Sequence, residues 1–479
     1  MRIAIVNPVW IHGPGMTAIR SGSRWPHVRR NFFNIYPFPF QLAYASSLLK
    51  REGHEVYAKD CIATNTLNEQ LLSELTAFKP DIVFFETTNP TFKYDVEFIA
   101  KVRENISCRI FAGGQLATSF PEKILAFTDG AIAGECEYVL KAICDRIDKN
   151  FPLDGIPGLS IILNNKLITT PPELIANIDD LPWPDRNIGP ARVYQDNFCA
   201  HFPSAQMITS RGCPHRCSFC MESYVFNHKA NFRRRKISDV VDEMEMLKRT
   251  YGVKEIYFDD TSFTVDRPRV HELCGEIINR KLKIKWSCMA DTKVDFDTLK
   301  VMKASGCRAI KVGVETVNPE TLQAILKPVE TEHADTCVDN CKKLGIFIHG
   351  TFILGLPGET ETTLDQTIKF AFTKGFDWMQ FSPAIPYSGT PFYEEAKKKG
   401  WLVKEEWDDE CLKTNVNLSY PQLPKTVIEK KLVEVRQRLS KRILLRPQLA
   451  FKYIKLLIHL RDISLIKVVI RRILSVFGL

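Results

Sequence analysis

The chain has 479 residues, of which 45% are hydrophobic, so it is long enough for about three domains with packed cores. Its 14 cysteines follow no secretory signal, and we therefore expect a reducing cytoplasmic setting without a disulfide framework or a membrane span. The formal net charge is +9, and residues 440–479, with nine Lys or Arg and one Asp, carry +8 of it. The remaining chain is nearly neutral, so no nucleic-acid partner is expected.

Residues 1–150 alternate short apolar runs with amphipathic segments. The runs predict strands at 3–6, 54–58, 81–85, 109–112 and 130–133. The amphipathic segments predict helices at 41–52, 67–78, 94–104 and 137–148. Strands separated by helices of this length form a parallel, doubly wound α/β sheet of the Rossmann type, which binds ligands beyond the carboxyl ends of its strands.

Small and polar residues follow three of these strands, at 86–88, 113–115 and 134–135. Gly113 and Gly114 would let a flat ligand approach the backbone closely, and Thr118 could donate a hydrogen bond to it. Two glycines after a strand are also common in ordinary turns, so the pattern by itself leaves both interpretations open.

Two irregular segments flank the first domain. Residues 8–39 form an unusually long loop, rich in aromatic residues and arginines, which is either a cap over a ligand or a surface insertion. Residues 151–200 carry closely spaced prolines, which exclude a long helix and predict a connector laid along the junction with the next domain.

Cys213, Cys217 and Cys220 stand at C-x3-C-x2-C spacing, directly after an apolar run at 206–209. Three thiolates on one loop suit an iron–sulfur cluster, and without a fourth cysteine one iron would stay open to a substrate or cofactor. A zinc site completed by His215 or His228 is the alternative, although structural zinc sites usually pair two cysteine dyads or add a well-spaced histidine pair.

The region 201–405 repeats strand–helix units. We predict strands at 206–209, 255–258, 285–289, 309–314, 347–354 and 378–382, and helices at 237–251, 296–305, 319–325, 333–344 and 361–373. Six such units form a partial (β/α)6 barrel with its reactive groups at the carboxyl ends of the strands. Asp259, Asp260, Glu315 and Gly355 fall at those ends, and a helix N-cap is the alternative role for each carboxylate.

Residues 406–479 are predicted to be helical, and from residue 448 onward apolar and basic residues alternate at helical spacing. A basic amphipathic helix is typical of a segment that lies on an anionic membrane. We therefore expect peripheral contact with the inner face of the cell membrane and a hydrophobic substrate, with packing against the barrel as the alternative.

The cysteine spacing, with the aromatic Phe219 before the third cysteine, resembles the signature of the radical S-adenosylmethionine superfamily. Residues 1–150, with Gly113 and Gly114 after the fourth strand, resemble the cobalamin-binding domain fused to many of its members. The layout is similar to the subgroup of the anaerobic magnesium-protoporphyrin ester cyclase and the hopanoid-associated radical proteins. The chain lacks the D-x-H-x-x-G box that elsewhere supplies a histidine to cobalt, and His12 has the wrong spacing to replace it.

The resemblance implies a 4Fe-4S cluster on the three cysteines, with S-adenosylmethionine chelating its open iron. The implied S-adenosylmethionine contacts are Phe219, Asp260, Glu315, Ile353 and Gly355, and the implied cobalamin contacts are Thr88, Gly113, Gly114, Thr118 and Gly134. Many relatives carry an arginine after the third barrel strand. Lys293 is the candidate replacement in this chain.

By the same resemblance, the reduced cluster would cleave S-adenosylmethionine to a 5′-deoxyadenosyl radical that removes hydrogen from an unactivated carbon, and methyl transfer from cobalamin would follow. Two alternatives are a radical cyclase or oxidoreductase on the same scaffold and a non-catalytic cobalamin or redox sensor. The expected partners are a small, lipid-like or tetrapyrrole substrate and an electron donor such as flavodoxin or ferredoxin.

Overall fold

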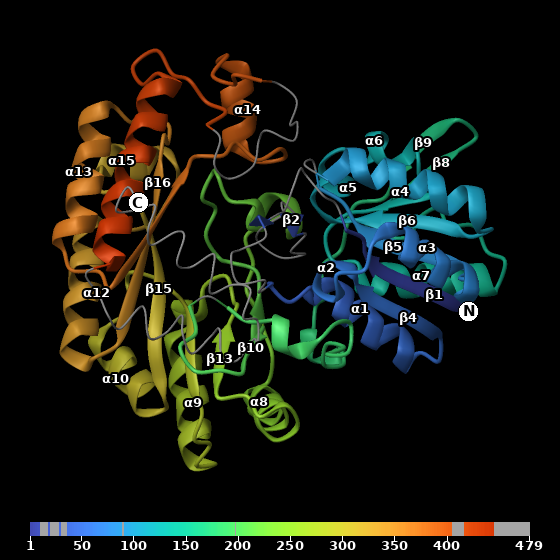
Figure 1. Cartoon of the computed structure of the whole chain (residues 1–479), viewed down its shortest axis with the longest axis horizontal. Coiled ribbons are helices and arrows are strands. Elements are labelled where there is room, and N and C mark those ends of the chain that lie inside the picture. The colour runs from blue at the N-terminus through green and yellow to red at the C-terminus, as the bar shows by residue number, and fades with distance from the viewer. Residues whose placement is uncertain are drawn as a thin grey trace.

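Two α/β domains lie side by side in the computed structural model (Figure 1), one around a seven-stranded sheet and one around a six-stranded sheet. The structure describes residues 1–9, 18–19, 28–29, 36–88, 91–196, 198–404 and 416–444. Most of the predicted loop at 8–39 therefore lies outside the described residues, which include its two ends and an antiparallel pair of two-residue strands, β2 (Ala18–Ile19) and β3 (Val28–Arg29).

The first domain confirms the doubly wound sheet. Its parallel strands are β1 (Arg2–Asn7), β4 (Glu55–Asp60), β5 (Ile82–Glu86), β6 (Arg109–Gly113) and β7 (Gly130–Ile132). Their order is β4-β1-β5-β6-β7. The chain therefore passes from β1 outward to β4 on one side and then returns to β5 on the other side, which makes the position between β1 and β5 the switch point of the sheet. A ligand crevice opens at such a switch point, outside the carboxyl ends of the strands.

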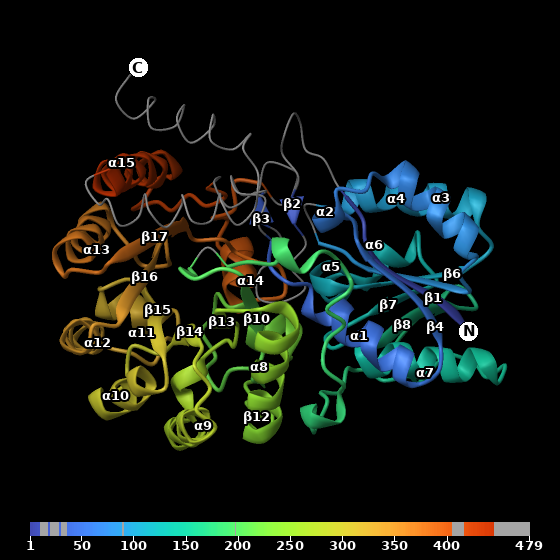
Figure 2. The same ribbon diagram turned by 60° about the horizontal axis from the view of Figure 1, so that its bottom comes forward.

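Helices cover both faces of this sheet (Figure 2), which explains why its strands are apolar runs. One face carries α1 (Phe40–Arg51) and α7 (Glu137–Asp148), and the other carries α3 (Asn68–Phe78) and α4 (Phe92–Asn105). Three short helices follow strand ends or lie between strands: α2 (Cys61–Thr64), α5 (Gly114–Ser119) and α6 (Pro121–Leu125).

A hairpin that the sequence analysis missed extends this sheet. Strands β8 (Leu159–Leu163) and β9 (Lys166–Thr169) add to β7 in antiparallel fashion. The two residues between them, Asn164 and Asn165, have φ of 50° and 59°, as a two-residue hairpin turn requires. The irregular, proline-rich connector therefore begins only after residue 169.

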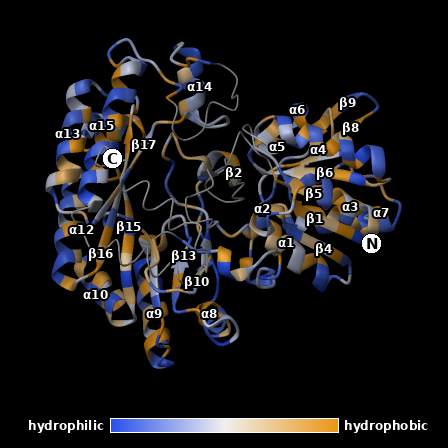
Figure 3. Cartoon of the chain, in the orientation of Figure 1, coloured by the Kyte–Doolittle hydropathy of each residue, from blue (hydrophilic) through white to orange (hydrophobic). Residues whose placement is uncertain are grey.

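The second domain confirms the partial barrel. Its strands are β10 (Ser204–Met207), β13 (Glu255–Phe258), β14 (Lys285–Ala290), β15 (Cys307–Glu315), β16 (Phe347–Leu354) and β17 (Trp378–Pro383), all parallel and in chain order. Strands arranged in this way bring all their carboxyl ends to one rim. The hydropathy colouring shows hydrophobic segments in these strands, and hydrophobic and hydrophilic residues alternating along the helices around them (Figure 3).

The helices outside the barrel are α8 (Ile237–Tyr251), α9 (Arg267–Asn279), α10 (Phe296–Ala304), α11 (Pro319–Ala324), α12 (Thr331–Leu344) and α13 (Glu361–Thr373). Helix α9 was not predicted, although its start is marked by Asp266, whose side chain accepts a hydrogen bond from the Arg269 N–H, and by a proline in the first turn.

Two further helices complete the described chain, α14 (Pro391–Lys398) and α15 (Lys425–Leu444). Ile428, Leu432 and Val435 of α15 share one hydrophobic core with Leu364 and Ile368 of α13. Within the described residues, no helix is both long and apolar enough to cross a membrane. The predicted basic amphipathic segment, from residue 448 onward, lies outside the described residues.

Asp60, at the carboxyl end of β4, ties the first sheet to the connector. Its Oδ1 accepts a hydrogen bond from Asn7 Nδ2 at 3.0 Å, and its Oδ2 accepts one from the Tyr194 hydroxyl at 3.0 Å. Burial raises the pKa of Asp60 to about 6, although the hydrogen bonds from Tyr194, Ala63 and Ile62 oppose that rise.

We expect Asp60→Asn to remove a pH dependence of stability. A carboxyl whose folded-state pKa lies above its unfolded value stabilises the fold below the unfolded pKa and loses that contribution as the pH rises through about 6. Between pH 5 and pH 8 the free energy of unfolding of the wild type should fall by roughly 1 kcal/mol through this group, and that of the variant should not. Denaturant melts at both pH values measure it. Asp154→Asn, at an exposed site, is the control, and equal pH dependence in all three proteins would contradict the assignment.

Candidate functional site

The cysteine loop follows β10 and is held at its start and in its middle. Gly212 has φ +86°, and a Cβ there would stand 2.3 Å from Asn231 Oδ1, so only glycine fits before the first cysteine. In the middle of the loop, the Ser218 N–H donates to the Ile325 carbonyl at 2.9 Å, and the Ser218 carbonyl accepts from the Phe392 N–H at 3.1 Å. The ends of α11 and α14 therefore fix the loop backbone.

Cys213, Cys217 and Cys220 are free, partly exposed thiols on this loop. Burial raises the pKa of Cys213 to about 11 and also raises the pKa of Cys217 and Cys220. Cys217 further raises the pKa of Cys213, and both of these thiols raise the pKa of Cys220, which places the three thiols near one another. Metal ions at this position would supply the positive charge that the thiolates need. Within the described chain, no three His, Cys, Asp or Glu side chains, these cysteines included, form a group that could hold a metal ion.

Asp260 anchors the start of the loop. Its Oδ1 accepts from the Thr209 N–H at 2.6 Å, and its Oδ2 accepts from the hydroxyls of Thr209 and Ser210 at 2.5 and 2.6 Å. The carboxylate is buried. Both of its oxygens are therefore engaged within the protein, and its predicted contact with S-adenosylmethionine stays a prediction beside this structural role.

A cation that the sequence analysis missed lies beside the cysteines. Lys327 Nζ lies 2.7 Å from Glu315 Oε1, and the Lys327 side chain is 14% exposed. Burial alone would lower the pKa of Lys327, but Glu315 and Cys217 hold it above its ordinary value, so the amine stays charged. Glu315 ends β15 with φ +65°, a conformation rare outside glycine and often found at functional sites.

The end of β14 contributes Asp291 to the same rim. Its Oδ2 lies 3.3 Å from His215 Nε2. Although burial raises the pKa of Asp291, the hydrogen bond from His215 and the charge of Lys327 are among the causes that bring it below its ordinary value. Lys293, the candidate from sequence, donates its backbone N–H to Asp291, and its carbonyl accepts from Arg267.

The end of β16 is shaped by a buried carboxyl. The N–H groups of Gly355 and Leu356 donate to Glu359 Oε2 at 2.8 and 2.9 Å, and the Tyr420 hydroxyl donates to the Gly355 carbonyl at 2.7 Å. Burial raises the pKa of Glu359 to about 7. The predicted residues Phe219 and Ile353 pack against the hydrophobic core that contains Leu354 and Leu356, the chain neighbours of Gly355.

The predicted cobalamin contacts also gather at one edge, the carboxyl ends of β5, β6 and β7: Thr88, Gly113, Gly114, Thr118 and Gly134. The Thr118 hydroxyl donates to the Gly114 carbonyl at 2.8 Å and accepts from the Gly134 N–H at 3.2 Å. Gly114 has φ +90°, and a Cβ there would stand 2.8 Å from the Thr87 carbonyl oxygen, so the turn itself requires glycine. Glycines and small hydroxyl side chains at this edge would let a large planar ligand approach the backbone.

This edge offers no histidine from the described part of its own domain. His54 precedes β4, at the opposite end of the sheet, and His12 lies outside the described residues. An imidazole does approach from the barrel, where His228 Nε2 is 3.4 Å from the position of a Cβ on Gly134. A protein ligand to cobalt is therefore not assigned.

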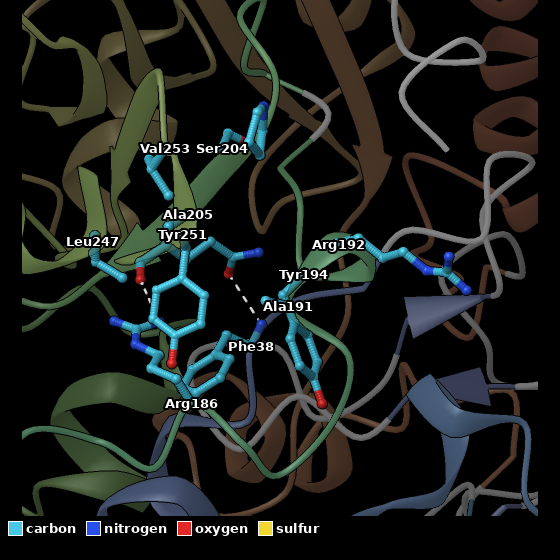
Figure 4. A pocket seen from close by; sticks show the side chains of 12 residues that line it. Phe38, Arg186, Ala191, Arg192, Tyr194, Ser204, Ala205, Leu247, Tyr251 and Val253 are labelled. Carbon is cyan, nitrogen blue, oxygen red and sulfur yellow. Dashed lines mark hydrogen bonds between the residues drawn. The ribbon is translucent and has the colours of Figure 1, made fainter. Parts of the chain in front are cut away.

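A cavity of about 260 Å³ lies elsewhere, between the connector and the first barrel strand (Figure 4). Phe38, Arg186, Tyr194 and Tyr251 line it, together with residues of β10. None of the three cysteines and none of the strand-end residues described above borders it, so it is separate from the candidate site.

Comparison with known proteins agrees with both expected kinds of domain. Residues 207–371 match the family model of the radical SAM superfamily, and residues 34–144 match that of the B12 binding domain. An uncharacterized methyltransferase of Pyrococcus horikoshii is 33% identical over 376 residues, which cover 77% of this chain and 80% of that protein. The anaerobic magnesium-protoporphyrin IX monomethyl ester cyclase of Cereibacter sphaeroides is 27% identical, over 83% of this chain and 64% of that protein.

Among solved structures, the radical S-adenosylmethionine methyltransferase TsrM of Kitasatospora setae, with cobalamin and a [4Fe-4S] cluster bound, has a similar fold. The match covers 84% of this chain and 76% of that one, with a TM-score of 0.65 and 21% identity. At this identity the likeness concerns the arrangement of the two domains.

We expect the triple substitution of Cys213, Cys217 and Cys220 by alanine to abolish cluster assembly, because these thiols are the proposed ligands. Iron and sulfide content and the visible absorption of anaerobically reconstituted protein measure it. Replacing Cys337 and Cys341 of α12 by alanine is the matched control and should leave the cluster in place. An iron–sulfur cluster in the triple variant would show that other residues hold it.

Proposed function

This chain belongs to the radical S-adenosylmethionine superfamily, among its members with a B12-binding domain, and on that premise we propose that it transfers a methyl group to an unactivated carbon of a small molecule. One observation carries the proposal. The start of the cysteine loop is bonded to the cobalamin-binding edge, since Arg211 donates to Glu135 at 2.9 Å. One substrate between the domains would then face both cofactors. The Pyrococcus relative, named a methyltransferase, supports the reaction class.

Three separate sets of residues would hold three bound groups. Cys213, Cys217 and Cys220 would hold the cluster, the barrel rim would hold S-adenosylmethionine, and the glycine-rich edge of the first sheet would hold cobalamin. When bound, these groups supply radical formation and methyl-carrier chemistry. The protein orients them and excludes water, with Asp260 fixing the loop that carries the cysteines.

Lys327 is proposed to bind the carboxylate of S-adenosylmethionine. Its ammonium is charged, largely buried and near Cys217, where a carboxylate on the open iron would need a counter-charge. Glu315 shares this ammonium at 2.7 Å, and its second oxygen could then accept hydrogen bonds from the cofactor. Lys327, rather than Lys293, would take the place of the arginine found in many relatives.

A radical cyclase or oxidoreductase is the second candidate function. The similarity to the magnesium-protoporphyrin ester cyclase, over 83% of this chain, favours it. The same similarity makes a tetrapyrrole a candidate substrate, beside the lipid-like class expected from sequence. An electron donor such as flavodoxin or ferredoxin and peripheral contact of the basic C-terminal segment with an anionic membrane complete the proposal.

The proposed function predicts two products from one assay. Protein reconstituted with cluster and cobalamin is given a reductant, S-adenosylmethionine with a labelled methyl group, and a small-molecule extract. We expect 5′-deoxyadenosine and a labelled product. Absence of 5′-deoxyadenosine would favour a non-catalytic sensor. If 5′-deoxyadenosine forms without label transfer, and cobalamin is not taken up even in excess, the cyclase or oxidoreductase alternative is favoured.

Lys327→Gln should weaken S-adenosylmethionine binding about tenfold or more, because a charge-assisted hydrogen bond contributes about 1.5–3 kcal/mol. Titration of the cluster-loaded protein, followed by the electron paramagnetic resonance of the reduced cluster, measures the affinity. Lys293→Gln is the matched control and should bind nearly as the wild type does, while Lys327→Arg should keep most of the affinity. The reverse order of effects at Lys327 and Lys293 would show that the sequence-based candidate was right.

A further inference from the structure

A buried ion cluster joins the cobalamin-binding edge to the cysteine loop. Arg211 Nη1 donates to Glu135 Oε1 at 2.9 Å, and Arg211 Nη2 donates to Glu137 Oε1 at 2.6 Å. Arg233 Nη1 donates to Glu135 Oε2 at 2.7 Å. The exposed fractions of the side chains are 12% for both arginines, 7% for Glu135 and 0% for Glu137, so water screens this cluster little.

The members of this ion cluster come from both domains. Glu135 and Glu137 follow β7, directly after the predicted cobalamin contact Gly134. Arg211 and Arg233 face each other in the two-stranded sheet of β11 (Ser210–Arg211) and β12 (Arg233–Arg234). The ion cluster therefore crosses the domain junction at the level of both candidate cofactor sites.

Arg211 is fixed from three directions by the first domain. Besides its two carboxylate partners, its guanidinium carbon lies 5.0 Å from the centre of the Tyr44 ring, which belongs to α1. A planar guanidinium with two carboxylates and a ring has one well-defined orientation, which a lysine ammonium would not impose.

The chain between Arg211 and the proposed ligands of the iron–sulfur cluster is short and stiff. Only Gly212 separates it from Cys213, and Gly212 is held at φ +86° against Asn231. On the other side, Gly134 precedes Glu135, and its N–H is bonded to Thr118. Neither the cysteine loop nor the end of β7 can shift without separating a buried charge from its partner. Leaving a buried charge without its partner strongly destabilises a protein.

We propose that Arg211 is a positioning residue that sets the separation between the iron–sulfur cluster and the cobalt of bound cobalamin. This inference rests on the proposed function, because it requires both cofactors in one molecule. Methyl transfer and hydrogen removal must reach the same carbon, and a misplacement of about 1 Å can cost a catalytic arrangement most of its rate. A positioning role therefore differs from simple attachment of the domains.

Magnetic interaction between the two cofactors tests this role without a substrate. In dithionite-reduced protein loaded with cluster and cobalamin, the cob(II)alamin spin relaxes faster because the reduced cluster is close. This enhancement falls steeply with distance, so a displacement of roughly 1 Å should lower it about twofold. We expect this loss in Arg211→Gln and in the milder Glu137→Gln, which keeps a neutral acceptor, and a smaller loss in Arg211→Lys.

The control is Arg216→Gln, because Arg216 is exposed on the same loop and lies over the Tyr224 ring of its own domain, 5.7 Å from the ring centre. Its relaxation enhancement should match the wild type. Iron, sulfide and cobalamin contents show that each variant is fully loaded.

Fully loaded Arg211→Gln and Glu137→Gln proteins with wild-type enhancement would overturn the positioning role and leave the proposed function intact. A wild-type protein that takes up no cobalamin would overturn the proposed function, and this inference with it.

Discussion

The carboxyl ends of parallel strands lie at one edge of a sheet. In this molecule that edge of the first sheet meets the corresponding rim of the barrel. The edge of the first sheet carries Gly134, which packs near the Phe226 carbonyl and His228 of the barrel domain. The barrel rim carries the cysteine loop and the polar ends of β13 to β16. Parallel sheets need helices on their faces and leave only these edges open. The proposed cofactor sites therefore lie at the junction between the two domains.

Buried ion pairs hold the junction between the two domains together. The carboxylates of Glu135 and Glu137 are buried, and a buried charge is tolerated only with a partner in good geometry. The partners, Arg211 and Arg233, flank the cysteine loop. The same low exposure raises the pKa of the cysteine thiols. Burial therefore makes the domain contacts specific and leaves the thiols dependent on metal for their charge.

Much of this arrangement is readable from local sequence, and some of it is not. The spacing of Cys213, Cys217 and Cys220, and the alternation of strand and helix, depend on neighbours in the chain and were predicted. Lys327 reaches Glu315 only because α11 turns the chain back to the rim. No periodic pattern reports such a contact, so the sequence alone offers only Lys293 as a candidate.

The missed hairpin is a different case. Asn164 and Asn165 stand between two apolar runs and have the positive φ of a two-residue turn, but the closely spaced prolines of 151–200 led the sequence analysis to predict an irregular connector. Asp260 shows a further limit, because its place at a strand end was predicted correctly, whereas its hydrogen bonds to Thr209 and Ser210 depend on where another strand ends. Position in a strand pattern identifies a candidate residue but not its partner.

Arginines complete the support of the cysteine loop because β10 is an edge strand. It pairs with β13 on one side only, and the carbonyls on the chain leading to the cysteines need other donors. Three arginines supply them, since Arg186 donates to the Gln206 carbonyl, Arg235 to the Ile208 carbonyl and Arg269 to the Thr209 carbonyl.

Two of these arginines also share one buried carboxylate. Arg186 and Arg235 both bond Glu243 of α8, at 2.8 and 2.6 Å. The guanidinium fork can serve a carbonyl and a carboxylate at once, which a lysine at the end of a flexible chain does less well. Arg186 belongs to the connector, so the segment between the domains is part of what holds the cysteine loop in place. The rigidity of the cluster site thus comes from its chain neighbours, from the connector and from the cobalamin-binding domain together.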